Sequence, residues 1–206
     1  HNNCAGKHAA MLSLCIYNGW DVGDYFLPEH PVQRTIRQMV VEMCDLSHGK
    51  LEVAIDGCGV PVFAMPLRNL AVGYARLASP EDAFGSESRG SAIRRVLKSC
   101  LGFPEMIGGT GRICTDIMKA PKKEPVFAKA GAEGAYAIAL PERGWGVAIK
   151  IDDGARRAAH SVAVEVLYKL GVFNKDSLEM LEKYRSPEVL NHRKEVVGKV
   201  VPVFEF

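Results

Sequence analysis

The sequence lacks the features that would place it in an extreme class of protein. No run of about 18 apolar residues occurs, so no segment is a candidate transmembrane helix. An excess of one charge is also lacking, because 26 Lys and Arg stand against 24 Asp and Glu, for a formal net charge of +2. No long basic tract, internal repeat or low-complexity segment is present. These absences give no reason to expect nucleic acid or a membrane as a partner.

Several familiar motifs are missing as well. There is no Gly-x-Ser-x-Gly elbow, no Walker loop, no dinucleotide fingerprint and no signal-peptide pattern, and we expect a cytoplasmic protein. The formal match to Ser-x-x-Lys is Ser47–Lys50, which Gly49 interrupts between a predicted helix and a predicted strand. Because a catalytic Ser-x-x-Lys needs a helix to return Lys to the side of Ser, we predict a loop there.

Cysteine occurs at six positions, too widely spaced for a disulfide framework in a chain long enough to bury a core. Cys4 and Cys58 lie in polar turns that contain Gly, whereas the other four lie in apolar helical patterns. Those four are predicted to be buried, reduced thiols, namely Cys15, Cys44, Cys100 and Cys114.

Apolar periodicity predicts mostly helices in the first 120 residues. Asn3 is expected to cap the first helix, Gly19 to end it, and Pro31 to lie in the first turn of the second. The predicted helices span 6–18, 31–44, 66–77, 91–101 and 111–119, with a strand at 51–55 and a polar loop at 79–90.

The last third of the chain has a different pattern. Strands are predicted at 125–128, 135–140, 145–151 and 195–206, and helices at 154–170 and 177–184. Asp152 or Asp153 is expected to cap the first of these helices. Antiparallel strands flanked by helices predict an α+β fold with a helical subdomain. We predict a mainly helical part, residues 1–120, and a second part, residues 121–206, that completes the sheet.

Two polar constellations precede the sheet. In Asn2–His8, backbone N–H groups of a helix N-terminus and a nearby cation favour a thiolate at Cys4, and Lys7 returns to the same side of the first turn. Asp56–Gly59 follows a predicted strand, where turns commonly carry functional side chains. An open zinc site of Cys4, Cys58, one nitrogen ligand and water is chemically feasible, because the four protein ligands of a closed site are lacking. The alternative is a capping Asn with an incidental Cys and Lys.

Two glycine-containing segments lie further along the chain. Lys129–Gly134 resembles the Lys-Thr-Gly element of serine β-lactamases and penicillin-binding proteins, in which the Lys faces the nucleophile. Its alternative is a Gly-rich hairpin with a surface Lys. Gly108–Arg112 can present backbone N–H groups or the Arg112 guanidinium to a carboxylate, or it can simply lead into a helix.

Taken together, Asn2–Leu12, Asp56–Pro61, Gly109–Arg112 and Lys129–Gly134 resemble the signature blocks of the Rhizobium-type asparaginase II family, in the same order along the chain. One departure is Ala5, where the family pattern has Ser. The resemblance implies a fold similar to serine β-lactamases and glutaminases, and a homodimer that hydrolyses L-asparagine to L-aspartate and ammonia.

The resemblance also implies roles for individual residues. Zinc near the substrate is held by Cys4, Lys7 and Cys58 with water, and Asp56 lies beside that site. Lys129 is implied as a catalytic residue of one of two Ser-Lys pairs. The residues implied in substrate binding are Cys4, Lys7, Asp56, Arg112, Ala130 and Gly131.

The nucleophilic serines and one Lys of these pairs have no counterpart in the sequence. We expect them in a segment before His1, and we expect the 206-residue polypeptide alone to be inactive. Ammonia release from asparagine by that polypeptide at a family-like rate would overturn this expectation. Two alternatives stay open at this point: a glutaminase or β-lactam-directed acylase, and a non-catalytic domain that binds zinc or an amino acid.

Overall fold

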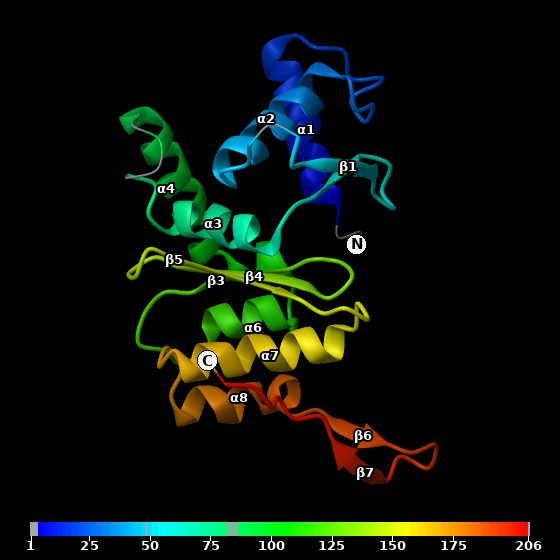
Figure 1. Ribbon diagram of the computed structural model, residues 1–206, viewed down its shortest axis with the longest axis vertical. Coiled ribbons are helices and arrows are strands. Elements are labelled where there is room, and N and C mark those ends of the chain that lie inside the picture. The colour runs from blue at the N-terminus through cyan, green and yellow to red at the C-terminus, as the bar shows by residue number, and fades with distance from the viewer. Residues whose placement is uncertain (1–3, 48, 82–83, 85, 206) are drawn as a thin grey trace. The chain divides into compact units, whose positions relative to one another are not determined.

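The computed structural model describes residues 4–47, 49–81, 84 and 86–205. The chain divides into two compact units, His1–Asn69 and Leu70–Phe206. Helices accompany small antiparallel sheets (Figure 1), which confirms the predicted α+β class. The predicted division into a mainly helical part, residues 1–120, and a part that completes the sheet, residues 121–206, stays a prediction. No helix among the described residues is long and apolar enough to cross a membrane.

The first unit begins with two helices, α1 (Ala5–Asn18) and α2 (Pro31–Met43). As predicted, α1 ends at Gly19, whose φ of 68° is a left-handed conformation that glycine adopts without a steric penalty. Pro31 lies in the first turn of α2, and the ring of His30 accepts the N–H of Val32. Asn3, the predicted cap of α1, lies outside the described residues, and the N-cap is Cys4.

A hairpin of β1 (Glu52–Ile55) and β2 (Pro61–Ala64) follows these helices. Its register pairs Ile55 with Pro61 and leaves residues 56–60 as the connecting turn. All four residues of β1 are exposed, although the sequence of this strand is largely apolar. The reason is that the hairpin has only two strands, and β2 was not predicted because Gly59 and Pro61 obscured its pattern.

Small apolar clusters stabilise this unit. Met11, Cys15, Val32 and Val60 are buried together, and the half-buried Tyr25 and Cys58 pack against them. Cys44 is buried in a second cluster with Leu46 and Leu51. Ser47, Gly49 and Lys50 lie outside the helices, in agreement with the predicted loop, while His48 lies outside the described residues.

The second unit contains more elements, arranged around one three-stranded sheet. Residues from Leu70 onward of α3 (Leu67–Ala78) belong to it. The others are α4 (Glu87–Gly102), α5 (Pro104–Gly108), α6 (Ile113–Lys119), β3 (Phe127–Ala130), β4 (Ala135–Leu140), β5 (Trp145–Lys150), α7 (Arg156–Lys169), α8 (Lys175–Arg185), β6 (Glu188–Leu190) and β7 (Val196–Lys199).

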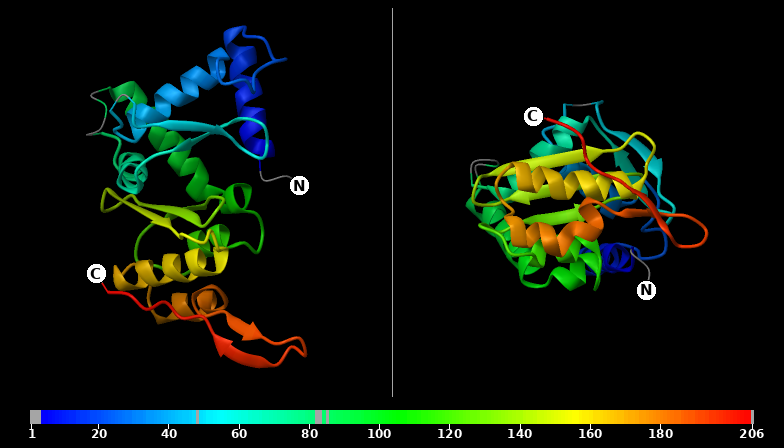
Figure 2. Two further views of the ribbon diagram at one scale, coloured as in Figure 1. Left: turned by 45° about the vertical axis from the view of Figure 1, so that its right-hand side comes forward. Right: turned by 90° about the horizontal axis from the view of Figure 1, so that it is seen from below.

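The central sheet has the antiparallel order β3-β4-β5. Figures 1 and 2 show α6 and α7 on one face, with α8 packed against α7. On the opposite face the ring of Tyr74 stacks on Phe127 at 6.1 Å. In the same row across the sheet, Phe127 is followed by Ala139 and Gly146. Because Ala139 and Gly146 are small, the backbone of α3 lies very close to the backbone of β5 at Gly146.

Several element boundaries differ from the prediction. β3 begins two residues later than expected, so Lys129 and Ala130 lie inside the strand rather than after it. α4 begins at Glu87 rather than Ser91, because the hydroxyl of Ser86 accepts the N–H of Arg89 and caps the helix. The short α5 and β6 were not predicted, and the final strand is confined to β7.

The start of α7 also differs in detail. Its N-cap is Ala155 rather than an aspartate, although Asp153 accepts the Ala155 N–H at 2.8 Å and pairs with Arg157. Cys100 is only half-buried, in contrast to the prediction, because it lies on α4 near the edge of the core.

His160 on α7 makes the stability of the second unit depend on pH. Its ring meets Tyr184 edge-on at 5.9 Å. Burial, followed by the positive charges of Arg156 and Arg112, lowers the pKa of His160 below its ordinary value. The unfolded chain therefore binds a proton more readily than the folded one, so stability is lost as the pH falls through the ordinary pKa.

We expect His160→Phe, which keeps the aromatic edge contact, to flatten this dependence. Between about pH 7 and pH 5 the wild type should lose more thermal stability than the variant. Unfolding midpoints measured across this range by circular dichroism test the expectation, and parallel curves for the two proteins would contradict it.

Candidate functional site

The first unit brings Cys4, Lys7, Asp56 and Cys58 together. Cys4 caps α1 and Lys7 lies in its first turn, whereas Asp56 and Cys58 belong to the β1–β2 turn. The Lys7 ammonium donates to Asp56 Oδ2 at 3.2 Å, and the Cys58 thiol donates to the same oxygen at 3.2 Å. The other oxygen, Oδ1, accepts the Gly57 N–H at 2.8 Å. The two sequence constellations therefore form one polar cluster.

These contacts shift the pKa values of the cluster in opposite directions. The Cys58 thiol, the Lys7 ammonium and the Gly57 N–H together lower the pKa of Asp56. Burial acts to lower the pKa of Lys7, but its hydrogen bonds to Cys58 and Asp56 outweigh this and raise it. In the metal-free cluster Lys7 is thus an ammonium and Asp56 a carboxylate.

The expected acidification of Cys4 was wrong for this metal-free cluster. Its hydrogen bond with Cys58 and its burial raise the pKa of the Cys4 thiol, as do the negative charges of Cys58 and Asp56. The positive charge of Lys7 opposes them without prevailing. The sequence pattern showed the nearby cation, but not the anionic groups that the hairpin turn adds.

The donor atoms fit a zinc ion in type and spacing. One ligand atom each from Cys4, Asp56 and Cys58 lies within 4.8 Å of the others. Ligand atoms of a tetrahedral zinc are about 3.3 to 3.8 Å apart, so small side-chain rotations suffice. No other group of three or more His, Cys, Asp or Glu side chains in the described part of the chain has this spacing. Lys7 would have to lose its proton before it could act as a ligand.

The second unit carries Lys129, Ala130 and Gly131 at the end of the sheet's edge strand. Lys129 is exposed, pairs in register with Ala137 and donates through Nζ to the Ala130 carbonyl. The Gly131 N–H donates to the Ala135 carbonyl at 2.8 Å. These contacts hold Lys129 on a strand rather than on a loop, which restricts the positions that its ammonium can reach.

Helix α6 supports this strand from its open edge. The buried Cys114 thiol sulfur accepts the Ala130 N–H at 3.1 Å and the Tyr136 hydroxyl at 3.6 Å. Arg112, the exposed N-cap of α6, lies two residues before Cys114. The contact of Cys114 with Ala130 therefore places the start of α6, which Arg112 caps, beside the end of β3.

A local network shapes the turn before α6. Gly109 and Gly111 have φ values of 86° and 69°, and the Thr115 hydroxyl donates to the Gly109 carbonyl at 2.7 Å. The Tyr184 hydroxyl donates to the Gly111 carbonyl at 3.2 Å and to Asp116 at 2.8 Å. Gly109–Gly111 is thus a turn between α5, which ends at Gly108, and Arg112, the N-cap of α6, and side-chain hydrogen bonds hold it in place.

Comparison of sequences decides the family. The sequence model of the L-asparaginase II family matches residues 1–202. The chain belongs to the L-asparaginase II family. It is accordingly an asparaginase-type amidohydrolase that acts on a small-molecule substrate. The comparison with curated proteins gave no match.

The contacts of Tyr25 and Gln33 in the first unit were not predicted from the sequence of this asparaginase-family chain. The His8 ring contacts the Tyr25 hydroxyl at 2.7 Å, and the Gln33 amide donates to the Tyr25 carbonyl at 2.7 Å. Gln33 is buried, and its Oε1 has no hydrogen-bond partner among the described residues. These contacts connect the first turn of α1 to the following loop. Nothing in the sequence around Tyr25 indicated them.

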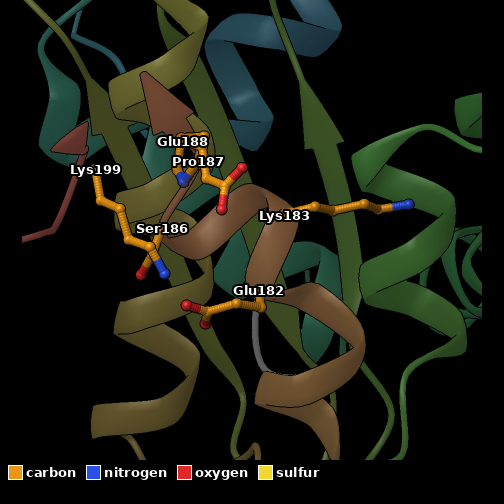
Figure 3. Close-up of a pocket in the computed structure, with 6 residues that line it drawn as sticks. All are labelled: Glu182, Lys183, Ser186, Pro187, Glu188 and Lys199. Atoms are coloured by element: carbon orange, nitrogen blue, oxygen red, sulfur yellow. The ribbon is translucent and has the colours of Figure 1, made fainter. Parts of the chain in front are cut away.

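A hollow of about 340 Å³ lies near the end of α8 in the second unit, and Figure 3 shows the residues that line it. It is lined by Glu182, Lys183, Ser186, Pro187, Glu188 and Lys199. None of these residues belongs to the blocks that resemble the asparaginase family, and we assign the hollow no part in the amidohydrolase chemistry.

Proposed function

We propose that this asparaginase-family protein hydrolyses L-asparagine to L-aspartate and ammonia. The observation that carries the proposal is the convergence of Cys4, Lys7, Asp56 and Cys58 into one polar cluster, within a chain that matches the family over residues 1–202. A capping residue with an incidental Cys and Lys, the structural alternative, does not account for this convergence. In the proposed reaction a nucleophilic serine attacks the side-chain amide carbon.

In this proposal Lys129 accepts the serine proton and delivers it to the departing ammonia. The strand position of Lys129 supports the role, because strands hold catalytic side chains more rigidly than loops do. Arg112 binds the substrate carboxylate through its guanidinium. Ala130 and Gly131 are proposed to contact the substrate at this edge of the sheet. In the structure their N–H groups donate to the Cys114 sulfur and the Ala135 carbonyl, and the Ala130 carbonyl accepts from Lys129.

Zinc is proposed to bind at Cys4, Lys7 and Cys58, with water completing the coordination and Asp56 beside it. The two thiols support this choice, since zinc binds thiolates, and the Asp56 carboxylate lies within 4.8 Å of both sulfurs. The ion, when bound, supplies a positive charge that positions the amino-acid end of the substrate. Lys7, an ammonium without metal, has to give up its proton on binding, so zinc affinity should rise with pH.

The reaction is tested by measuring ammonia release by the complete protein from asparagine and glutamine, together with hydrolysis of a chromogenic cephalosporin. We expect kcat/KM to be highest for asparagine. Preference for glutamine would establish the glutaminase alternative, and preference for the cephalosporin the acylase alternative. No turnover of any of the three would leave the binding-domain alternative.

The zinc site makes a separate prediction. Cys58→Ser should weaken zinc binding by at least about 100-fold, because even outer-shell changes cost about 10- to 100-fold. Competition with a chromogenic chelator measures this, and Cys100→Ser, which alters a half-buried thiol of the second unit, is the matched control. Metal-stripped enzyme should keep turnover with a raised KM. Complete loss of turnover would contradict the positioning role.

A further inference from the structure

Among the described residues, Cys4 and Cys58 are the one pair of cysteines whose side chains contact each other. The two thiols are hydrogen-bonded to one another, and their sulfurs belong to the group of ligand atoms that lie within 4.8 Å. Both side chains are half-buried. All six cysteines are present as thiols, and Cys15, Cys44 and Cys114 are buried.

The backbone brings these two sulfurs together without help from a metal ion. Cys4 is at the first turn of α1, and Cys58 lies in a hairpin turn whose base is closed by the Asp56 N–H to Val60 carbonyl bond of 2.9 Å. Cys58 also packs against the buried cluster formed by Met11, Cys15, Val32 and Val60. Because α1 contributes Met11 and Cys15 to that cluster, the core that anchors the turn also anchors the helix.

We propose that Cys4 and Cys58 are a reversible thiol–disulfide modification site, whose oxidation excludes zinc from the cluster. The oxidant is a low-molecular-weight disulfide. The thiolate of one cysteine attacks a sulfur of that disulfide, which forms a mixed disulfide and releases one thiol. The thiolate of the second cysteine then attacks the protein sulfur of the mixed disulfide and releases the other thiol. Two protein thiols are oxidised and one small disulfide is reduced to two thiols.

The short distance between the two sulfurs and their exposure favour this step at the cluster over the other cysteines. Half-burial leaves Cys4 and Cys58 accessible to a small disulfide, whereas Cys15, Cys44 and Cys114 are buried. Formation of the disulfide removes the hydrogen bond of 3.2 Å that the Cys58 thiol donates to Asp56. Cys100 is the other half-buried cysteine, on α4 of the second unit.

Disulfide and zinc are mutually exclusive here because they use the same two sulfurs. Zinc binds thiolates, and each sulfur of a disulfide has lost the negative charge that makes it a ligand. Oxidation leaves only Lys7 and Asp56, which are already paired with one another at 3.2 Å. Formation of the disulfide does not depend on the proposed function. Only the effect of the disulfide on catalysis rests on the proposed function.

The experiment treats the complete, metal-free protein with oxidised glutathione and follows it by intact mass spectrometry. We expect a loss of two hydrogen masses and, after non-reducing digestion, one peptide pair that joins residue 4 to residue 58. Dithiothreitol should reverse both changes, and prior loading with zinc should prevent them. Cys4→Ser should instead retain one glutathione on Cys58, because no second thiol is there to displace it, and Cys100→Ser should behave as wild type.

Three results would overturn the proposal: no loss of hydrogen, a cross-link that involves another cysteine, or an oxidised protein that binds zinc as tightly as the reduced one. Zinc binding is measured with a chelator, so this readout needs no catalytic turnover. If the complete protein forms the disulfide but releases no ammonia from asparagine in its reduced state, the proposed function alone is refuted. A chain that hydrolyses asparagine without forming the disulfide would refute the redox site alone.

Discussion

Lys129→Met is expected to lower kcat for asparagine by about 10²- to 10⁴-fold, the range associated with removing a general acid–base group. Lys129 is exposed on the edge strand β3, and the backbone pairing of that strand with β4 keeps its position. The loss should appear in kcat more than in KM, because the proposed proton transfer occurs in the transition state. Ammonia release by the complete protein measures both constants.

A second substitution at the same position separates two roles of the lysine. Arg keeps the positive charge but does not release its proton in proteins. If Lys129 acts as the base, Lys129→Arg should be nearly as inactive as Lys129→Met. Recovery of most of the activity by arginine would show that charge alone is needed. Lys98→Met, which changes an exposed lysine of α4, is the control and should leave kcat unchanged.

Gly146→Ala is expected to give the largest loss of stability of any single methyl addition considered in this chain. A Cβ atom at Gly146 would lie 1.9 Å from the Ala71 carbonyl oxygen and 2.4 Å from the Ala75 nitrogen. Both are backbone atoms of α3, which cannot rotate away as a side chain can. The helix and strand must separate, so we expect a loss of about 3 kcal/mol or more in the free energy of unfolding.

The matched control for this substitution is Gly198→Ala. Gly198 is also a strand glycine of the second unit, and a Cβ built on it meets no atom within 4 Å. Its replacement should leave the stability unchanged or raise it by a few tenths of a kcal/mol, because alanine restricts the unfolded chain. Urea unfolding of both variants measures the difference. A loss below about 1 kcal/mol for Gly146→Ala would show that α3 does not pack rigidly on β5.

Much of the fold could be predicted because its signals are local. Gly19 ends α1 through a left-handed backbone, and Pro31 begins α2 with a preset φ, as the sequence indicated. β4, β5 and their hairpin were also predicted correctly, since alternating apolar residues flank a polar turn. The elements β2, α5 and β6 were not predicted, because such short segments carry too few residues for a periodic pattern.

For the site, the sequence by itself determined which residue types are available: two thiols in Gly-containing turns, a lysine one turn after the first thiol, an aspartate two residues before the second, and Lys129 before a Gly-rich turn. Tertiary structure alone decided that Lys7 meets Asp56, a residue 49 positions away. It also decided that the Cys4 pKa is raised and that Gly146 must lack a side chain. Local patterns depend on the sterics and hydrogen bonds of neighbouring residues, whereas these three features depend on which distant backbone segments pack together.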